Sequence, residues 1–529
     1  MQNERNSNNQ TLASRLLNLL SIFAVAVGMI YCNGGISVGS SNHVGLLPVV
    51  RRILDPSYLP GDFNIALRFY HHRAFAYLVA GGSSLLGEDR ALIVLGVLAM
   101  LTISAGLFAL CSQLGLSRGG FLVVGAFAAT RFLWTGKGLE LNEFLGDPEV
   151  MPPHLAHALA LFVLTALLKE KYRLAIFLTG LAILLHLQIG ATLALMTSPL
   201  YVIKLREFGL KETAVLIALA VIPASPALWH VTHMLQRGLA SSKISSAYYI
   251  DFRHPHHFEL FSVAAAFWVI GHLAVIGCAG YASALACSNK SRKASEFLLQ
   301  PIGKLFICCL SLLALCLIHF ADYYLIKNDK LAQIQFLRLT PLITILGAIG
   351  LVWIIGRWLT NQKLLAAVNV LLIAAAIVWG YYSPRRTEVP YYFGVNRFAE
   401  QTSTWVNVAN WVKANGARDT VYLVPPGRNG FSVLAERSIV AEFKLNPDGS
   451  MNLAEWFERM RDLAGGELPT GRGFDNRRPL DRAFAKLTNE QLLALSQKYN
   501  AGYAVLAKDS KAQFQVIYQN KDYRVVKLR

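Results

Sequence analysis

The chain has 529 residues, of which 54% are hydrophobic and 16% are charged. Its mean hydropathy of +0.41 is too high for a water-soluble enzyme or a disordered protein, so the composition excludes both classes. The formal net charge of +18 would suit a nucleic-acid-binding protein, but it also suits a membrane protein with basic cytoplasmic loops. The position of the charges along the chain decides between these two classes.

A spanning helix needs about 20 mainly apolar residues, and the sequence contains about eleven runs of this kind. They cover residues 14–32, 91–111, 119–135, 154–168, 174–187, 188–203, 213–229, 259–287, 302–320, 337–357 and 364–382. Two of these runs, 174–187 and 188–203, are short, so we expect a tight pair of spans with a break between His186 and Gly190. The pattern predicts a mainly α fold, with a polytopic transmembrane bundle over residues 1–382.

The basic residues indicate which way the bundle is oriented. When the spans alternate sides, Lys and Arg gather on the side of the N-terminus, for example in segments 169–173, 204–211 and 290–293. The loops on the other side, called outer here, are nearly neutral in charge. This asymmetry is typical of a chain with a cytoplasmic N-terminus. Topology therefore accounts for most of the positive charge, and no nucleic-acid partner is predicted.

The first outer loop, residues 33–90, is too long to be a simple connector. Its segment 44–54 is an apolar run that ends in Arg51 and Arg52, which predicts an interfacial helix on the outer leaflet with two guanidinium groups near lipid phosphates. Two acidic residues, Asp55 and Asp62, follow in a stretch rich in turn-forming residues. We expect this loop to carry part of a functional site.

The second outer loop adds Glu140, Glu143, Asp147 and Glu149. Opposite charges are expected near these carboxylates, because Arg131 lies near the outer end of the third span and Arg338 at the outer start of the tenth. Carboxylates and guanidinium groups at one face could take a proton from a hydroxyl while they hold a lipid-linked phosphate. No Asp or Glu lies well inside a predicted span, which disfavours an ion-coupled transporter.

Histidine and cysteine give weaker signals. His186, at the expected break, either lines a cavity or is a satisfied core histidine. His254, His256 and His257 could ligate a metal, or they form an interfacial cluster at the start of a span. The seven cysteines lie in or beside apolar runs without a C-x-x-C motif, so they predict neither disulfides nor a metal site. We assign no metal-ligating residue.

An odd number of spans places residues 383–529 outside, where the composition becomes that of a small α/β domain. Helices are predicted at 402–416 and 452–466, and Thr488 with Gln491 forms a capping box that opens a third helix. Strands are predicted at 421–425, 437–443, 503–507, 514–520 and 523–528, of which the last two form a hairpin.

This layout of a first span, two acidic outer loops, a broken span and an outer α/β domain resembles the type-C glycosyltransferases. The segments 42–63, 152–190, 335–342 and 405–431 are similar to a group of uncharacterised bacterial polytopic membrane proteins. The resemblance covers nearly the whole chain. It implies a transferase in the bacterial cytoplasmic membrane that uses a polyprenyl-phosphate-linked sugar, with an acceptor that it does not identify.

The resemblance also implies site roles. It implies an inverting reaction with a first-loop carboxylate as general base, and basic residues that hold the polyprenyl phosphate. This chain has Asn42 and His43 where members of the family place an acidic residue, so Asp62 is the predicted base and Asp55 the second choice. The predicted substrate-binding residues are Arg131, Arg338, Arg51, Arg52, Glu140, Glu143, Asp147 and His186. For the second-loop carboxylates, the resemblance implies binding of the acceptor or of a divalent metal ion.

Two other functions stay open. A membrane protein that keeps this fold but lacks the base would handle lipid, or serve as a scaffold, without catalysis. A transporter is the less favoured alternative.

Overall fold

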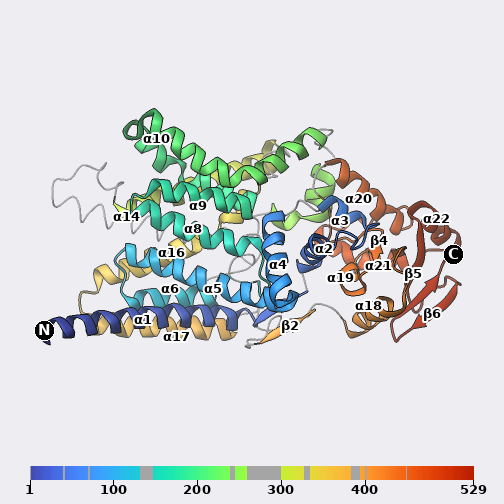
Figure 1. The fold of residues 1–529 in the computed structure, drawn as a ribbon, viewed down its shortest axis with the longest axis horizontal. Helices are drawn as coiled ribbons and strands as arrows, with labels where there is room; N and C mark the ends of the chain where they lie inside the picture. The colour runs from blue at the N-terminus through green and yellow to red at the C-terminus, as the bar shows by residue number, and fades with distance from the viewer. Residues whose placement is uncertain are drawn as a thin grey trace.

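The fold is known from a computed structural model. It describes residues 2–39, 42–68, 72–130, 147–238, 245–258, 300–326, 334–382, 394–398, 402–447 and 450–529. The molecule is an elongated helical bundle with an α/β domain at one end (Figure 1). The N-terminus lies at the opposite end of the bundle from this domain. We call the two ends of the bundle the domain end and the N-terminal end.

The helices of the bundle correspond to the predicted spans. They are α1 (Gln2–Cys32), α5 (Glu88–Gln113), α6 (Arg118–Thr130), α8 (Pro152–Leu168), α9 (Tyr172–Leu185), α10 (Leu187–Gly238), α14 (Pro301–Phe320), α16 (Pro341–Trp358) and α17 (Gln362–Tyr382). Within the described ranges, six helical stretches are long and apolar enough to cross a membrane, and α6, α8 and α9 are shorter apolar helices. The chain is therefore a multi-pass membrane protein, as predicted. The expected span at 259–287 lies outside the described residues.

The break predicted near His186 is confirmed. Helix α9 ends at Leu185, His186 has an extended backbone (φ −149°, ψ 100°), and α10 begins at the next residue. The 52-residue α10 is itself two arms joined by a kink at Gly209 (φ 65°, ψ 178°). The two arms match the separate spans predicted at 188–203 and 213–229.

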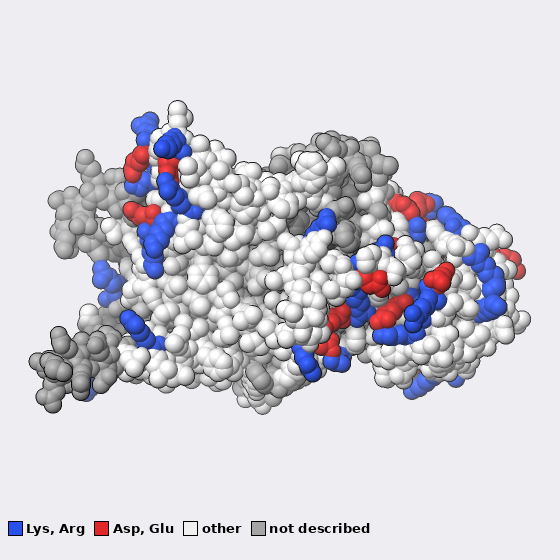
Figure 2. Space-filling view, in the orientation of Figure 1, with Lys and Arg blue, Asp and Glu red and all other residues white. Residues whose placement is uncertain are grey.

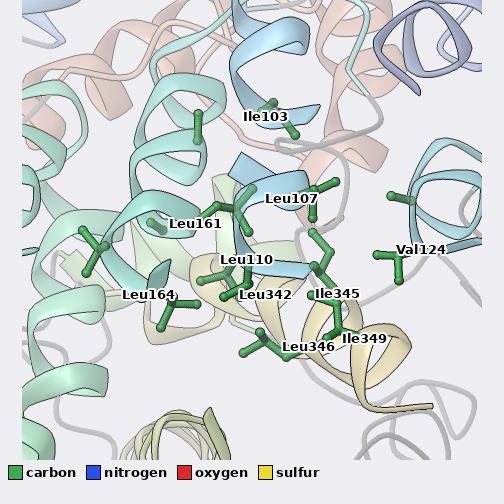
Figure 3. Packing of buried hydrophobic residues seen from close by; sticks show 14 of the residues in the cluster. Ile103, Leu107, Leu110, Val124, Leu161, Leu164, Leu342, Ile345, Leu346 and Ile349 are labelled. Atoms are coloured by element: carbon green, nitrogen blue, oxygen red, sulfur yellow. The ribbon is translucent and has the colours of Figure 1, made fainter. Parts of the chain in front are cut away.

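Aliphatic side chains from four helices interlock in the middle of the bundle (Figure 3). The residues that Figure 3 labels are Ile103, Leu107 and Leu110 of α5, Val124 of α6, Leu161 and Leu164 of α8, and Leu342, Ile345, Leu346 and Ile349 of α16. On the outer surface of the bundle many apolar side chains are exposed, for example Ile222 at 70% and Leu371 at 67%. Exposed apolar surface of this kind is what a bilayer covers. On the face shown in Figure 2, charged side chains gather at the two ends and leave the middle nearly uncharged.

The first loop forms three helices at the domain end: α2 (His43–Leu54), α3 (Phe63–Arg68) and α4 (Arg73–Leu86). Helix α2 confirms the helix predicted at 44–54, but its apolar face packs against α4, α5 and the C-terminal domain, where it meets Val433 and Leu445. The loop lies between bundle and domain, so protein covers a face that the sequence predicted would lie on lipid.

A short parallel strand pair joins the two ends of the transmembrane region. Strand β1 (Ile36–Val38), just after α1, pairs with β2 (Val395–Arg397), which follows α17 in sequence. The sequence does not indicate this pairing, because the strands are three residues long and far apart in the chain.

The C-terminal domain has one five-stranded sheet in the order β4-β3-β5-β7-β6. Its strands are β3 (Val421–Leu423), β4 (Ser438–Ile439), β5 (Ala501–Ala507), β6 (Gln515–Gln519) and β7 (Tyr523–Lys527). Strand β3 runs parallel to β4 and β5, whereas β7 is antiparallel to β5 and forms the predicted hairpin with β6. The α/β prediction is therefore confirmed.

Helices pack on both faces of this sheet. Its helices are α18 (Ser403–Asn415), α19 (Phe431–Ala435), α20 (Ser450–Leu463), α21 (Arg477–Ala485) and α22 (Asn489–Tyr499). Side chains of α18 and α19 form one core, and α20, α21 and α22 contribute to another. The Thr488 and Gln491 capping box opens α22, as predicted.

The contact between α9 and α10 leaves no room for a side chain at Gly190. A Cβ atom there would lie 2.3 Å from the backbone nitrogen of Ile183, whereas one at Gly356 in α16 would meet nothing within 4 Å. We expect Gly190→Ala to lower the free energy of unfolding by about 1–3 kcal/mol, because the two helices must separate. Gly356→Ala should be neutral or stabilising, since alanine favours helix. Thermal unfolding of both variants in detergent tests this, and equal stability of the two would contradict the packing described.

Candidate functional site

Cationic and imidazole side chains from three separate segments gather where the bundle meets the C-terminal domain. We define this cationic cluster as Arg253, His254, His256, His257, Arg338 and Lys444. The first four follow one another along η1 (Ser245–Arg253) and η2 (Pro255–His257), after the second arm of α10. Arg338 lies in the short turn η4 (Phe336–Leu339) that leads into α16, and Lys444 belongs to the domain.

Direct contacts hold the cluster together. Arg338 Nη2 donates to His257 Nδ1 at 3.2 Å, and Arg253 Nη2 donates to the Lys444 carbonyl at 3.2 Å. The imidazole rings touch one another, with ring centroids of His256 and His257 4.2 Å apart and those of His254 and His257 4.9 Å apart. The cluster therefore spans the junction between bundle and domain.

Electrostatics keeps the histidines of the cluster neutral. Burial, followed by the charges of Arg253, Arg338 and Lys444, lowers the pKa of His256 to about 3. Burial and nearby positive charge also hold the pKa values of His254 and His257 well below the usual value. At neutral pH the positive charge is thus carried by two guanidinium groups and one ammonium group, beside neutral imidazoles. This combination of donors and positive charge suits an anion such as phosphate.

Arg338, a predicted site residue, is held by its neighbours in the fold. Its Nε donates to the side-chain oxygen of Gln335, whose amide nitrogen donates to the Tyr249 hydroxyl at 2.8 Å. Its carbonyl accepts from His157 Nε2 at 3.1 Å, which connects η4 to α8. The guanidinium is thereby fixed at the start of α16, at the domain end.

Asp62, the predicted general base, lies away from solvent at 2% exposure, in the contact between the first loop and the domain. Its Oδ1 accepts from the backbone N–H groups of Asn64 and Ile65 at 3.0 Å, and its Oδ2 accepts from Ile439 N at 3.1 Å. Burial raises its pKa to about 6, against these hydrogen bonds and the charge of Arg459, which lower it. The carboxylate caps α3 and ties the first loop to β4.

Asp55, the second choice, is exposed at the end of α2. Its Oδ1 accepts from the backbone nitrogen of Ser57 at 2.9 Å and from the Ser57 hydroxyl at 2.6 Å. These two hydrogen bonds lower its pKa. The geometry is that of a local turn, and the catalytic roles of Asp55 and Asp62 stay predictions.

Arg51 and Arg52 contact protein groups of the loop and the domain. Arg51 forms a bidentate pair with Glu88, with both N···O distances 2.8 Å, and donates to the Val433 carbonyl at 2.8 Å. Arg52 donates to the Tyr58 carbonyl at 2.7 Å. These contacts fasten α2 to α5 and to the domain, and binding of lipid phosphate by this pair stays a prediction.

The second loop is described from Asp147 onward. Asp147 Oδ1 accepts from the backbone nitrogen of Glu149, and Glu149 Oε2 accepts from Asn42 N at 2.9 Å. The second loop is therefore linked to the start of α2. Arg131, Glu140 and Glu143 lie outside the described residues, so their predicted roles stay predictions. Among the described residues, no group of His, Cys, Asp and Glu side chains is arranged to hold a metal ion.

His186 lies in the break between α9 and α10 and is 2% exposed. Its Nδ1 accepts from Ile189 N at 3.3 Å, which caps the first turn of α10. Its ring centroid lies 5.0 Å from that of His72, so the break meets the start of α4 in the first loop. These contacts place His186 at the domain end, and a substrate contact by this residue stays a prediction.

Sequence reasoning missed two members of the cluster, Arg253 and Lys444. It singled out the adjacent histidines, either as metal ligands or as an interfacial cluster at the start of a span. Lys444 lies 106 residues after Arg338 in a domain predicted to be separate, so no local pattern connects them. The only available signal was the RHPHHF stretch itself, which concentrates donors at the start of a predicted span.

Two acids of the domain, the buried Glu442 and the half-buried Asp481, were also missed. Glu442 is fully buried, and its Oε2 accepts from Gly430 N at 2.9 Å. Burial raises its pKa to about 8, with Lys444 and Arg477 acting in the opposite direction. Asp481 accepts from Gly427 N at 2.8 Å, and burial raises its pKa to about 6. These carboxylates accept hydrogen bonds from the N–H groups of Gly427 and Gly430, in the loop between β3 and α19.

The raised pKa of Glu442 predicts a loss of stability in alkali. An acid whose folded pKa lies above its unfolded value stabilises the fold less as the pH rises from about 4.5 to about 8. Asp62 and Asp481, with pKa values of about 6, are mostly ionised above pH 6.5. Among these three acids, Glu442 is therefore the one whose ionisation changes most between pH 6.5 and 8.5. We expect the free energy of unfolding of Glu442→Gln to exceed that of the wild type by about 1–3 kcal/mol at pH 8.5, and by less at pH 6.5.

Thermal unfolding at the two pH values measures this difference, with Glu467→Gln as the control at an exposed position of the same domain. The same stability difference at both pH values would show that Glu442 does not titrate in this interval.

Comparisons with known proteins give the following similarities. A family model for a domain of unknown function (DUF6798) matches residues 403–463, from α18 to α20. No curated protein matches the sequence. Among solved structures, the oligosaccharyltransferase of Archaeoglobus fulgidus with Zn and sulfate is similar at a TM-score of 0.45 and 12% identity, over 92% of this chain and 68% of that one.

The archaeal oligosaccharyltransferase AglB from Archaeoglobus fulgidus, with an inhibitory peptide and a dolichol-phosphate, is similar at a TM-score of 0.45 and 11% identity, over 93% and 70% of the two chains. ArnT from Cupriavidus metallidurans in the apo state is similar at a TM-score of 0.43 and 11% identity, over 98% of both chains. The chain itself is a multi-pass helical membrane protein with a C-terminal α/β domain.

Proposed function

We propose that the protein binds a polyprenyl-phosphate-linked sugar at the cationic cluster and transfers the sugar to an acceptor. The observation that carries the proposal is the meeting of Arg253, Arg338 and Lys444 around buried imidazoles at the domain end. Two guanidinium groups and an ammonium group provide charge-assisted hydrogen bonds to phosphate oxygens. The resemblance of the sequence layout to type-C glycosyltransferases supports the same assignment.

The place of the cluster suits a lipid-linked ligand. Arg338 lies in η4, just before α16. The apolar residues of α16 lie between the two charged ends of the bundle. A phosphate at Arg338 can therefore keep its polyprenyl chain beside the apolar helices, in the hydrocarbon layer.

The proposal places the cluster on the outer face of a bacterial cytoplasmic membrane. The N-terminal end of the bundle carries basic residues such as Lys204, Arg173 and Lys304, of which Lys304 pairs with Glu170 at 2.9 Å. By the distribution of positive charge, that end faces the cytoplasm. The C-terminal domain and the cluster then lie outside.

In the proposed reaction an acceptor hydroxyl gives its proton to a carboxylate as its oxygen bonds to the anomeric carbon. The bond from that carbon to the phosphate oxygen breaks, and polyprenyl phosphate leaves with the bonding electrons. The arginines and the lysine stabilise the phosphate charge that develops. Asp62 stays the predicted base, since a pKa of about 6 suits proton transfer near neutral pH.

A second function is favoured by the contacts of the two candidate bases. Both oxygens of Asp62 accept backbone N–H groups, and Asp55 forms a local turn with Ser57. A carboxylate engaged in this way must leave its partners before it can contact an acceptor. The second proposal is therefore a protein that binds the lipid phosphate at the same cluster, as a carrier or scaffold, without sugar transfer.

Both functions require the cluster to bind lipid phosphate. We expect Arg338→Ala to weaken binding of polyprenyl phosphate at least tenfold, because it removes a guanidinium held at the start of α16. The matched control is Arg357→Ala, which removes an arginine near the C-terminal end of α16, where it lies over Trp353.

Native mass spectrometry of the protein in lipid nanodiscs measures the binding. Size-exclusion chromatography shows that each variant is folded. Equal binding by wild type, Arg338→Ala and Arg357→Ala would remove the cluster from both proposals.

Asp62→Asn separates transfer from binding. We expect it to lower the free energy of unfolding by about 1–3 kcal/mol, because the amide nitrogen cannot accept the Ile439 N–H. If Asp62 is the base, transfer is also lost at temperatures where the variant stays folded. Asp55→Asn, at an exposed position, should keep both stability and transfer.

Transfer is measured with a labelled polyprenyl-phosphate sugar in membranes. A folded Asp62→Asn variant with the wild-type rate would exclude Asp62 as the base. Lipid binding by a wild type that transfers no sugar would favour the second function.

A further inference from the structure

Four side chains, Asp251, Tyr323, Arg472 and Phe474, lie beside the cationic cluster where bundle and domain meet, and we call them the rim. Asp251 belongs to η1, Tyr323 to η3 (Ala321–Ile326), and the other two lie at the start of η6 (Gly473–Asn476) in the domain. Arg472 Nη2 donates to Asp251 Oδ1 at 2.8 Å and to the Tyr323 hydroxyl at 3.4 Å. The rim therefore joins bundle and domain beside the cluster.

The rim side chains are more exposed to solvent than Arg253 and Lys444 of the cluster. The side chains of Arg472 and Asp251 are 50% and 55% exposed, and Phe474 is 45% exposed. Arg253, by contrast, is 4% exposed and Lys444 is 9% exposed. Because Phe474 of the rim contacts His256 and Arg253, a ligand whose phosphate binds at the cluster can present its remaining polar part to the exposed rim.

Phe474 connects the rim directly to the cluster. Its ring centroid lies 5.0 Å from that of His256, and the Arg253 guanidinium lies 5.0 Å from the same ring. The preceding Gly473 has a positive φ of 57°, and a Cβ there would lie 2.9 Å from Pro255. The close backbone contact holds the exposed ring next to the histidines.

These four side chains match the chemistry of a sugar ring. The face of a sugar is a patch of C–H groups that packs on an aromatic ring, and its hydroxyls exchange hydrogen bonds with carboxylate, guanidinium and phenol groups. In a lipid-linked donor the sugar is bonded directly to the phosphate, so it lies one ring away from the groups that bind that phosphate. Phe474 lies at about this distance from the cluster, since its ring centroid is 5.0 Å from that of His256.

We infer that the rim is the subsite for the sugar of the lipid-linked donor. Phe474 packs against the sugar ring, and Asp251, Tyr323 and Arg472 bind its hydroxyls. The inference rests on the proposed binding of a lipid phosphate at the cluster, and it adds which residues discriminate a glycosylated lipid from the bare one.

The test compares two kinds of probe in nanodiscs: bare polyprenyl phosphate, and polyprenyl phosphate that carries glucose, mannose or arabinose. We expect the wild type to bind at least one glycosylated probe more tightly than the bare lipid. Phe474→Ala should reduce this preference, measured as the ratio of the two affinities, at least fivefold. Phe474→Trp, which keeps an aromatic face, should retain it.

Leu493→Ala is the matched control, because Leu493 is an apolar residue of the same domain with a similar exposure of 41%. It should change neither affinity. The sugar subsite is overturned if the preference for each glycosylated probe is the same in wild type and Phe474→Ala. The proposed function still stands in that case, provided that Arg338→Ala weakens binding of both probes. A wild type that binds neither kind of lipid overturns the proposed function and the subsite together.

Discussion

The rest of the structure depends on the contact between the first loop and the C-terminal domain. Asp62 accepts hydrogen bonds from its own helix and from Ile439 of the domain, and Arg51 joins Glu88 of α5 to the Val433 carbonyl. These are charged groups in a buried or half-buried contact, where an unmet hydrogen bond costs more than at an exposed surface. Together with the apolar face of α2, they hold the domain against the bundle. Without that contact, Lys444 would not approach the histidines.

The cationic cluster is a consequence of this arrangement. Arg338 and the histidine segment belong to the bundle, whereas Lys444 comes from the domain, as does the Phe474 ring of the adjacent rim. Bringing positive charges together has an unfavourable electrostatic energy, and the imidazoles, because they are neutral, do not add to it. Charge gathered in this way at the end of an apolar bundle suits an anionic head group whose lipid chain stays in the membrane. The exposed rim beside it suits a polar group attached to that head.

The candidate bases show how a plausible pattern can have two explanations. An Asp beside Gly and Pro in a long loop suggests a reactive carboxylate, and it also suggests a helix cap or a turn. The structure shows caps and turns at both Asp62 and Asp55. For Asp62 it also shows a raised pKa, which has burial as its first cause. The same burial makes the carboxylate a stronger base and limits its access to an acceptor.

Much of the architecture was determined by the sequence alone. The apolar runs predicted the helices because a segment that spans a bilayer must satisfy its backbone within itself, and this requirement is local. The break at His186, the capping box at Thr488 and the hairpin at the C-terminus are local patterns for the same reason. Arg338 was also selected as a candidate, because a charge at the edge of an apolar run stands out in a single sequence.

The tertiary structure alone decided the contacts between distant segments. The pairing of β1 with β2, the burial of α2 by the domain, and the meeting of Arg253 with Lys444 join residues 191 or more positions apart. The hydrophobic periodicity of the sequence does not predict such contacts, because each depends on how the first loop, the bundle and the domain pack together. Charge patterns in the sequence predicted a site at the outer end. The packing decided which of the charged residues lie together.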